Sequence, residues 1–133
     1  MTINEFRKRQ EKRNKGKAAA SEHDLQVQCV HIFRMLYPNQ WRLLMAIPNG
    51  GYRTATTARK MHAEGVQAGV PDMLLAVARK GYHGLWIEMK NGKAGRVSEL
   101  QNEMIARLKA EGYACAVCRT QEEFINTIKE YID

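Results

Sequence analysis

The sequence has few cysteines and no long hydrophobic run. Its 133 residues include three cysteines, an odd number without the spacing of a disulfide framework, which favours a reducing cytoplasm. No apolar stretch approaches the roughly 18 residues of a membrane-spanning helix, and the N-terminus lacks the hydrophobic segment of a secretory signal. The sequence therefore predicts a cytoplasmic protein with one core and no membrane partner.

Several standard catalytic and cofactor motifs are also missing. Neither of the two standard glycine-rich phosphate loops occurs, and no serine or cysteine lies in a nucleophile elbow. The four histidines show no metal-ligand spacing, and Cys115 and Cys118 lack the second cysteine pair that a zinc site needs. Both cysteines are expected to be small core residues, pointing to opposite faces of one strand.

Positive charge is concentrated at the N-terminus. The chain has a net charge of +7, and its first 20 residues carry seven basic and two acidic side chains. This segment suits an anionic polymer as partner, although a solvated tail that only aids solubility explains the charge about as well. We expect a basic arm over 1–20, unstructured or loosely helical, and a single domain over 21–133. The candidate nucleic-acid contacts are Arg7, Lys8, Arg9, Lys12, Arg13, Lys15 and Lys17.

Helical and strand patterns alternate through the rest of the chain. Helices are expected over 21–37 and 54–64, from Ser98 to Gly112, and from Thr120 onward. Strands are expected over 41–47, 73–78, 85–90 and 113–118, with a turn at 48–51. The last two strands and the helix between them form a parallel crossover unit. The predicted fold class is therefore α/β, a mixed central sheet flanked by helices.

Two of the expected helices begin with capping-box patterns. Ser98 is followed three residues later by Gln101, and Thr120 by Glu123. The inner stripe of the first of these helices is expected to consist of Leu100, Met104, Ile105 and Leu108.

Three charged side chains are expected to meet at the end of one hairpin. Asp72 precedes an apolar strand, and the next strand carries Glu88 and Lys90, two residues apart and so on one face. Folding the strands about the glycine-containing turn at 79–84 brings Asp72 roughly opposite Glu88 and Lys90. Two carboxylates beside a lysine suit a divalent cation that activates water next to a phosphate.

Each of these residues also has a purely structural interpretation. Asp72 could be a turn residue, and Glu88 and Lys90 could lie on the solvated face of an edge strand. Trp86 shares their face and makes a simple polar surface less natural, so the three together favour a site. Glu22 by itself is explained as an acid that is favoured at a helix N-terminus. Gln101 by itself is explained as the glutamine of a capping box.

At these positions the chain resembles the PD-(D/E)XK nuclease superfamily and, more closely, the VRR-NUC family. The resemblance covers roughly residues 21–133. Its motifs are Glu22-x-x-x-Gln26, Pro48-Asn49-Gly50-Gly51, Gly65 to Asp72 (GVQAGVPD), Ile87-Glu88-Met89-Lys90, and Ser98-Glu99-Leu100-Gln101.

The resemblance implies a restriction-endonuclease-like fold and metal-dependent cleavage of DNA phosphodiester bonds. Lys90 would position or deprotonate the attacking water, and Gln101 would be an active-site residue. The resemblance implies that Mg²⁺ or Mn²⁺ is held by Asp72, Glu88, the backbone carbonyl of Met89, and Glu22 as an additional acid.

Stand-alone members of this size resemble bacterial or viral homodimers that cut branched DNA such as four-way junctions. An interface is expected at the helix around Thr54–Met61 or at the Tyr52–Arg53 loop. Two alternatives stay open: a non-catalytic basic nucleic-acid-binding protein, and an RNA-processing nuclease. The second is less favoured because the sequence has no aromatic platform for single-stranded RNA.

Overall fold

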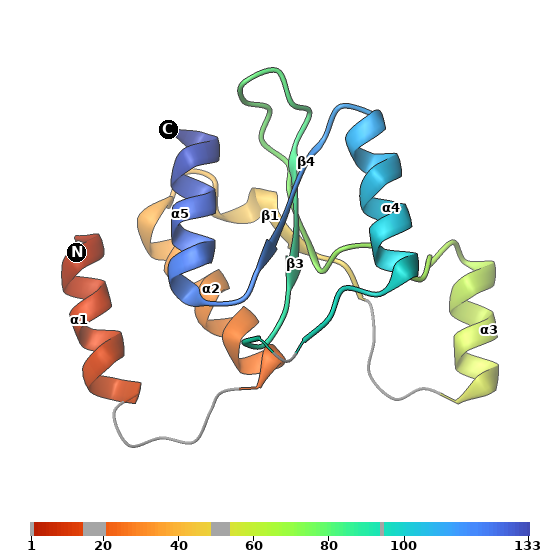
Figure 1. The fold of residues 1–133 in the computed structure, drawn as a ribbon, viewed down its shortest axis with the longest axis horizontal. Helices are drawn as coiled ribbons and strands as arrows, with labels where there is room; N and C mark the ends of the chain where they lie inside the picture. Colours follow the sequence, from red (N-terminus) through yellow and green to blue (C-terminus); the bar gives the residue numbers. More distant parts are fainter. Residues whose placement is uncertain (1, 15–20, 49–53, 94) are drawn as a thin grey trace.

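The expected order of helices and strands is confirmed, with one further helix at the N-terminus. The computed structural model describes residues 2–14, 21–48, 54–93 and 95–133 (Figure 1). No helix within these ranges is both long and apolar enough to cross a bilayer. The elements are α1 (Ile3–Asn14), α2 (Glu22–Leu36), β1 (Leu44–Ala46), α3 (Ala55–Ala63), β2 (Met73–Leu75), β3 (Leu85–Met89), α4 (Glu99–Ala110), β4 (Ala114–Cys118) and α5 (Gln121–Ile132).

A mixed four-stranded sheet in the order β1-β2-β3-β4 forms the centre of the molecule. The pairs β1–β2 and β2–β3 are antiparallel, and β4 runs parallel to β3, as expected for a crossover through α4. Helices α2 and α5 cover one face of the sheet, and α4 covers the other (Figure 1). The predicted α/β class, with a mixed sheet flanked by helices, is therefore correct.

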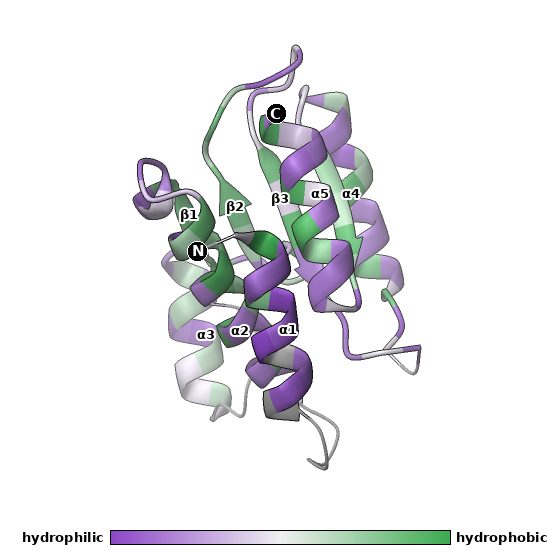
Figure 2. Ribbon diagram, turned by 90° about the vertical axis from the view of Figure 1, so that its left-hand side faces the viewer, coloured by the Kyte–Doolittle hydropathy of each residue, from purple (hydrophilic) through white to green (hydrophobic). Residues whose placement is uncertain are grey.

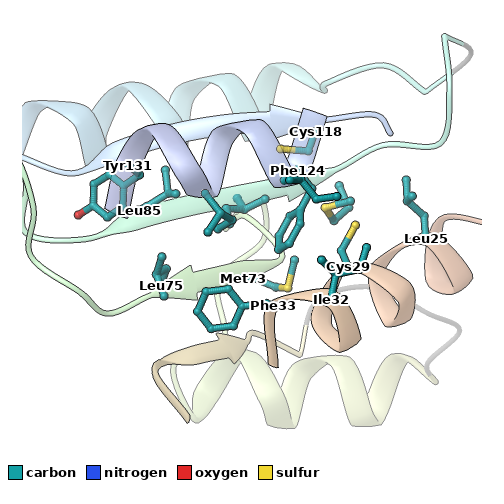
Figure 3. Close-up of a cluster of buried hydrophobic side chains, with 14 of the residues drawn as sticks. Leu25, Cys29, Ile32, Phe33, Met73, Leu75, Leu85, Cys118, Phe124 and Tyr131 are labelled. Carbon is teal, nitrogen blue, oxygen red and sulfur yellow. The ribbon is translucent and has the colours of Figure 1, made fainter. Parts of the chain in front are cut away.

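The hydrophobic core lies between the sheet and the helices α2 and α5 (Figure 3). Alternate residues of β3 point into it, since Leu85, Ile87 and Met89 are buried. Facing them are apolar side chains spaced three or four residues apart on the two helices, as helical periodicity requires. These are Leu25, Cys29, Ile32 and Phe33 of α2 and Phe124, Ile125, Ile128 and Tyr131 of α5.

Two strands are shorter than the apolar runs predict. The segment Trp41–Leu43 forms a 3₁₀ turn, so β1 begins only at Leu44. The expected strand over 73–78 ends at Leu75, where the pairings Leu44↔Leu75 and Leu75↔Leu85 also end. An apolar run shows that a segment is buried, but strand length depends on where the neighbouring chains leave the sheet. Of the turn expected at 48–51, only Pro48 lies within the described residues.

The capping predictions are confirmed in one helix and half confirmed in another. Ser98 and Gln101 form both hydrogen bonds of the capping box of α4. Thr120 caps α5, but the carboxylate of Glu123 accepts from the Arg119 N–H at 2.6 Å, one residue before the cap. The prediction that Leu100 points inward is wrong, because it is 50% exposed in the first turn of α4.

The described part of the basic arm is a regular helix that packs against the domain. Phe6 is only 3% exposed and belongs to the core, which explains why the arm is more ordered than its charge predicts. Arg7 Nη2 pairs with Glu122 Oε1 of α5 at 2.5 Å. Figure 2 shows that the rest of α1 is mostly hydrophilic. Lys15, Lys17 and the Arg13 side chain lie outside the described residues, and the division of the chain at residue 20 stays a prediction.

Gly69 allows the segment that leads to Asp72 to pass directly beside α4. Its φ is +85°, and a Cβ built on it would lie 2.8 Å from the Leu100 carbonyl oxygen. Gly65 has a similar φ of +101°, but a Cβ there would meet nothing within 4 Å. A larger residue would therefore be strained by the positive φ at either position, but it would clash with a neighbour only at position 69.

We predict that Gly69→Ala lowers the free energy of unfolding by about 2–4 kcal/mol, the sum of left-handed strain and overpacking. Gly65→Ala should cost about 1–2 kcal/mol, from strain alone. Urea unfolding of the two variants and the wild type measures both effects. Equal losses would show that Leu100 yields and that the close approach at Gly69 is unimportant.

Candidate active site

Asp72 is held at the entrance to β2 by its neighbours. Pro71 before it is buried, and the Asp72 carbonyl accepts from the Ile47 N–H at 2.8 Å. The side-chain atom Asp72 Oδ2 accepts from the backbone N–H of Met89 at 2.7 Å. The carboxylate is thus tied to the end of β3.

Glu88 lies directly beside Asp72 because of the strand register. Met73 pairs with Ile87, so one further step along the antiparallel ladder places Asp72 opposite Glu88. Among the described residues, Glu88 is the one buried charged side chain, at 2% exposure. Because side chains alternate along β3, Glu88 points away from the core face that Ile87 and Met89 occupy, as the sequence predicts.

A third carboxylate comes from α2. Glu22 is the first residue of that helix, directly after the capping residue Ser21. One carboxylate oxygen from each of Glu22, Asp72 and Glu88 lies within 4.8 Å of the other two. We call these three residues the acidic cluster. Glu22 is exposed, Asp72 half-buried and Glu88 buried, so the cluster opens to solvent on the α2 side.

Lys90 supplies positive charge at the edge of the acidic cluster. Its Nζ is 3.8 Å from Glu88 Oε1, and its side chain is only 12% exposed. Among the ion pairs found in the described ranges, no other involves a member of the cluster. One lysine thus faces three carboxylates, so the cluster carries excess negative charge when all of them are ionised.

The pKa of Glu88 reflects first its burial and then the negative charge beside it. Burial, its hydrogen bond to Asp72 and the negative charge of Asp72 raise the pKa of Glu88 from 4.5 to about 8, although Lys90 opposes the shift. Within the described part of the chain, Glu88 Oε2 is buried without a hydrogen-bond partner. A buried carboxylate oxygen without a partner, beside two more carboxylates, fits a hard divalent cation such as Mg²⁺ or Mn²⁺.

The remaining predicted site residues that the structure describes lie outside the acidic cluster. Gln101 lies outside the acidic cluster, and its Oε1 accepts from the Ser98 N–H at 2.9 Å. It is nevertheless close to the segment leading to Asp72, because the adjacent Leu100 contacts Gly69. Of the basic arm, Lys8, Arg9 and Lys12 are exposed on α1, whereas Arg7 is engaged with Glu122. Their roles stay predictions.

One residue near the site was given no role from the sequence. Arg119 follows β4, and its guanidinium Nη1 donates to the carbonyls of Gly92 and Gly95, in the loop that follows Lys90. The acceptors are backbone atoms at least 24 positions away along the chain. No local pattern can mark such a residue, because tertiary structure alone brings it to its partners.

Comparisons with known proteins give one family. A family model described as the VRR-NUC domain matches residues 20–122. A solved structure titled VRR_NUC domain protein superimposes with a TM-score of 0.76 at 27% sequence identity, covering 87% of this chain and 91% of that one. The comparison with curated proteins gave no match.

We predict that the metal-free protein loses stability as the pH rises. Glu88 has a raised pKa in the folded state, so between about pH 4.5 and pH 8 the unfolded chain releases a proton that the folded chain retains. This contribution is complete below pH 4.5 and lost as the pH passes through 8. Thermal unfolding in chelator at several pH values should show the decline.

The matched variant is Glu88→Gln, which keeps the shape of the protonated carboxyl but cannot titrate. Its melting temperature should fall less than that of the wild type across the same pH range. Divalent metal should stabilise the wild type more at pH 8.5 than at pH 6, since cation and proton compete for the cluster. Parallel pH profiles for the wild type and Glu88→Gln would contradict the assignment.

Proposed function

This chain belongs to the VRR-NUC domain family, and from that premise we propose that it is a divalent-metal-dependent endonuclease that hydrolyses DNA phosphodiester bonds. The observation that carries the proposal is the convergence of Glu22, Asp72 and Glu88 with Lys90 at the end of β3. This is the arrangement of acids and lysine expected for the PD-(D/E)XK superfamily, and the sequence and structural matches to VRR-NUC proteins are consistent with it.

The three carboxylates are assigned to metal binding. Asp72 Oδ2 accepts from the Met89 N–H, which fixes the orientation of the carboxylate toward the other two acids. Glu88 Oε2 has no other partner, and Glu22 completes the set from the solvent side. In an extended strand the N–H and C=O of one residue point the same way, so the Met89 carbonyl also faces the Asp72 edge. A divalent cation bound here would neutralise phosphate oxygens and make water more acidic.

Lys90 is assigned to the attacking water. Its stem is covered and its Nζ lies beside Glu88. As an ammonium group it can orient a water molecule, and only as the neutral amine can it accept the proton of that water. Gln101 is proposed to contact water or substrate from the start of α4 through its side-chain NH₂ group, since the capping bond uses its Oε1. Holding the reacting groups in one fixed geometry is expected to supply much of the rate enhancement.

The preferred substrate is proposed to be branched DNA, cut by a homodimer. The described residues of one chain form a single acidic cluster, so paired cuts across a four-way junction need two copies related by a two-fold axis. No residue of α3 is buried, and Figure 1 shows this helix at the end of the molecule opposite α1, which supports α3 as the interface. The alternative interface at Tyr52–Arg53 lies outside the described residues. Light scattering at micromolar concentration tests the dimer.

We predict that cleavage requires both the metal and the clustered side chains. Asp72→Ala and Glu88→Ala should each reduce the single-turnover rate by roughly 10³-fold or more, because a hard ligand is removed. Lys90→Ala should reduce it by roughly 10²–10⁴-fold through the loss of proton transfer or water orientation. The assay measures cleavage of linear duplex, flap and four-way-junction DNA with Mg²⁺ or Mn²⁺.

The control is Glu103→Ala, which removes an exposed carboxylate that pairs only with Arg107 on α4. Its cleavage rate should match that of the wild type. Full activity in chelator would overturn the metal mechanism, and equal rates on linear and junction DNA would overturn the preference for branches. Binding of DNA without any divalent-dependent cleavage would favour the alternative, a non-catalytic nucleic-acid-binding protein.

We also predict that the basic arm sets affinity and not chemistry. Because Phe6 is part of the core, substitution is a cleaner test than deletion. Replacing Lys8, Arg9 and Lys12 with alanine should weaken DNA binding and reduce its salt dependence. The log–log slope should fall by up to about 0.9 for each phosphate that the arm no longer neutralises.

The matched control removes the same charge elsewhere, by replacing Arg107, Lys109 and Lys129 with alanine. Its salt slope should change less than that of the arm variant. Fluorescence anisotropy at several salt concentrations, with cleavage rates at saturating protein, separates affinity from chemistry. Identical slopes for both triple variants would show that the arm does not touch DNA.

A further inference from the structure

We propose that Arg119 is a positioning residue for the reaction. By binding the Gly95 carbonyl it holds Gly95 against the aliphatic stem of Lys90, and so keeps the ammonium group of Lys90 beside Glu88. The inference rests on the proposed function for its effect on cleavage. The restriction of the Lys90 side chain by Arg119 and Gly95 follows from contacts among described residues, and it can be tested without any substrate.

The first observation is the set of contacts that Arg119 makes. Its Nη1 donates to the Gly92 carbonyl at 2.9 Å and also to the Gly95 carbonyl. Its backbone N–H donates to Glu123 Oε2 in the first turn of α5. One guanidinium thus ties two points of the loop to the junction of β4 and α5. Both bonds come from the planar Nη1 amino group, whose two N–H directions are fixed by the guanidinium plane, whereas the donors of an ammonium group rotate freely.

The second observation is the path of that loop. A Cβ built on Gly95 would lie 3.2 Å from Lys90 Cβ and 3.4 Å from Lys90 Cδ. The chain therefore leaves β3 at Lys90 and folds back so that Gly95 lies against the aliphatic stem of the same lysine. This explains how a lysine next to an exposed asparagine, Asn91, is itself only 12% exposed.

The third observation is that the backbone of Lys90 is already fixed by the sheet. Its N–H donates to the Cys118 carbonyl at 3.0 Å, directly before Arg119 in the chain. What remains free is the side chain, which has four rotatable bonds. Gly95 restricts these from one side, and Arg119 holds Gly95 in place. The lysine is thereby confined to conformations that reach the acidic cluster.

A competing role for Arg119 is direct contact with DNA phosphate. The two roles differ in what they predict, since a phosphate contact contributes to affinity and salt dependence. A positioning residue contributes to the rate of the bound complex, where a displacement of about 1 Å can cost about 10²-fold. Nη1 is already shared between two carbonyls, which favours the positioning role.

The first test measures access to Lys90 in the absence of DNA. Acylation of lysines, followed by mass spectrometry, should modify Lys90 several-fold faster in Arg119→Ala than in the wild type, with Lys109 and Lys129 as internal references. Arg119→Lys should show an intermediate increase, and Gly95→Ala should also expose Lys90 by pushing the loop outward. Arg107→Ala, which alters an exposed arginine on α4, should leave all rates unchanged.

The second test measures cleavage. Arg119→Ala should lower kcat by roughly 10–10²-fold with KM and DNA affinity within about twofold of the wild type. In a Lys90→Ala background the same substitution should cause little further loss, because Arg119 acts through Lys90. A raised KM with unchanged kcat, or unchanged Lys90 labelling in folded Arg119→Ala, would overturn the proposal. Labelling as expected with no cleavage by the wild type would instead refute the nuclease function.

Discussion

The antiparallel register between β2 and β3 is the constraint on which the site depends. Pairing of Met73 with Ile87 places Asp72 opposite Glu88, and the hydrogen bond from the Met89 N–H to Asp72 Oδ2 secures the end of the ladder. A slip of one residue would turn Glu88 into the core and place Ile87 on the face of the acidic cluster, because side chains alternate along a strand. The packing of the core therefore protects the geometry of the charged groups on the other face.

Burial of Glu88 has a cost that the rest of the site offsets only in part. The sheet removes its carboxylate from water, with one lysine nearby and one oxygen left without a partner. Such a group stays protonated to a higher pH, or it binds a cation. Stability of the metal-free fold and affinity for metal are therefore linked through one side chain. The same logic explains why Lys90 benefits from being held in place: its ammonium group is the resident counter-charge of the acidic cluster.

Several features were open to prediction from the sequence because they depend on local patterns. The period-two alternation of β3 assigned Glu88 and Lys90 to one face, and the glycine-containing turn at 79–84 favoured a hairpin. Capping residues Ser98 and Thr120 located the starts of α4 and α5. Leu100 was misplaced because helical periodicity groups residues into one stripe but does not show which of them the rest of the protein covers. The lengths of β1 and β2 were missed because an apolar run does not show where the neighbouring chains leave the sheet.

By itself, the sequence determined the α/β class, the order of the elements and the pairing of Asp72 with Glu88, since propensity, periodicity and turn chemistry act over a few residues. Local patterns left Glu22 a plain helix-terminal acid, and it was placed with the other two acids only through the family resemblance. Only the tertiary structure decided that Phe6 anchors the basic helix and that Arg119 reaches Gly92 and Gly95. Each of these contacts joins segments far apart in the chain. Their formation depends on how the helices pack on the sheet, which no short stretch of sequence encodes.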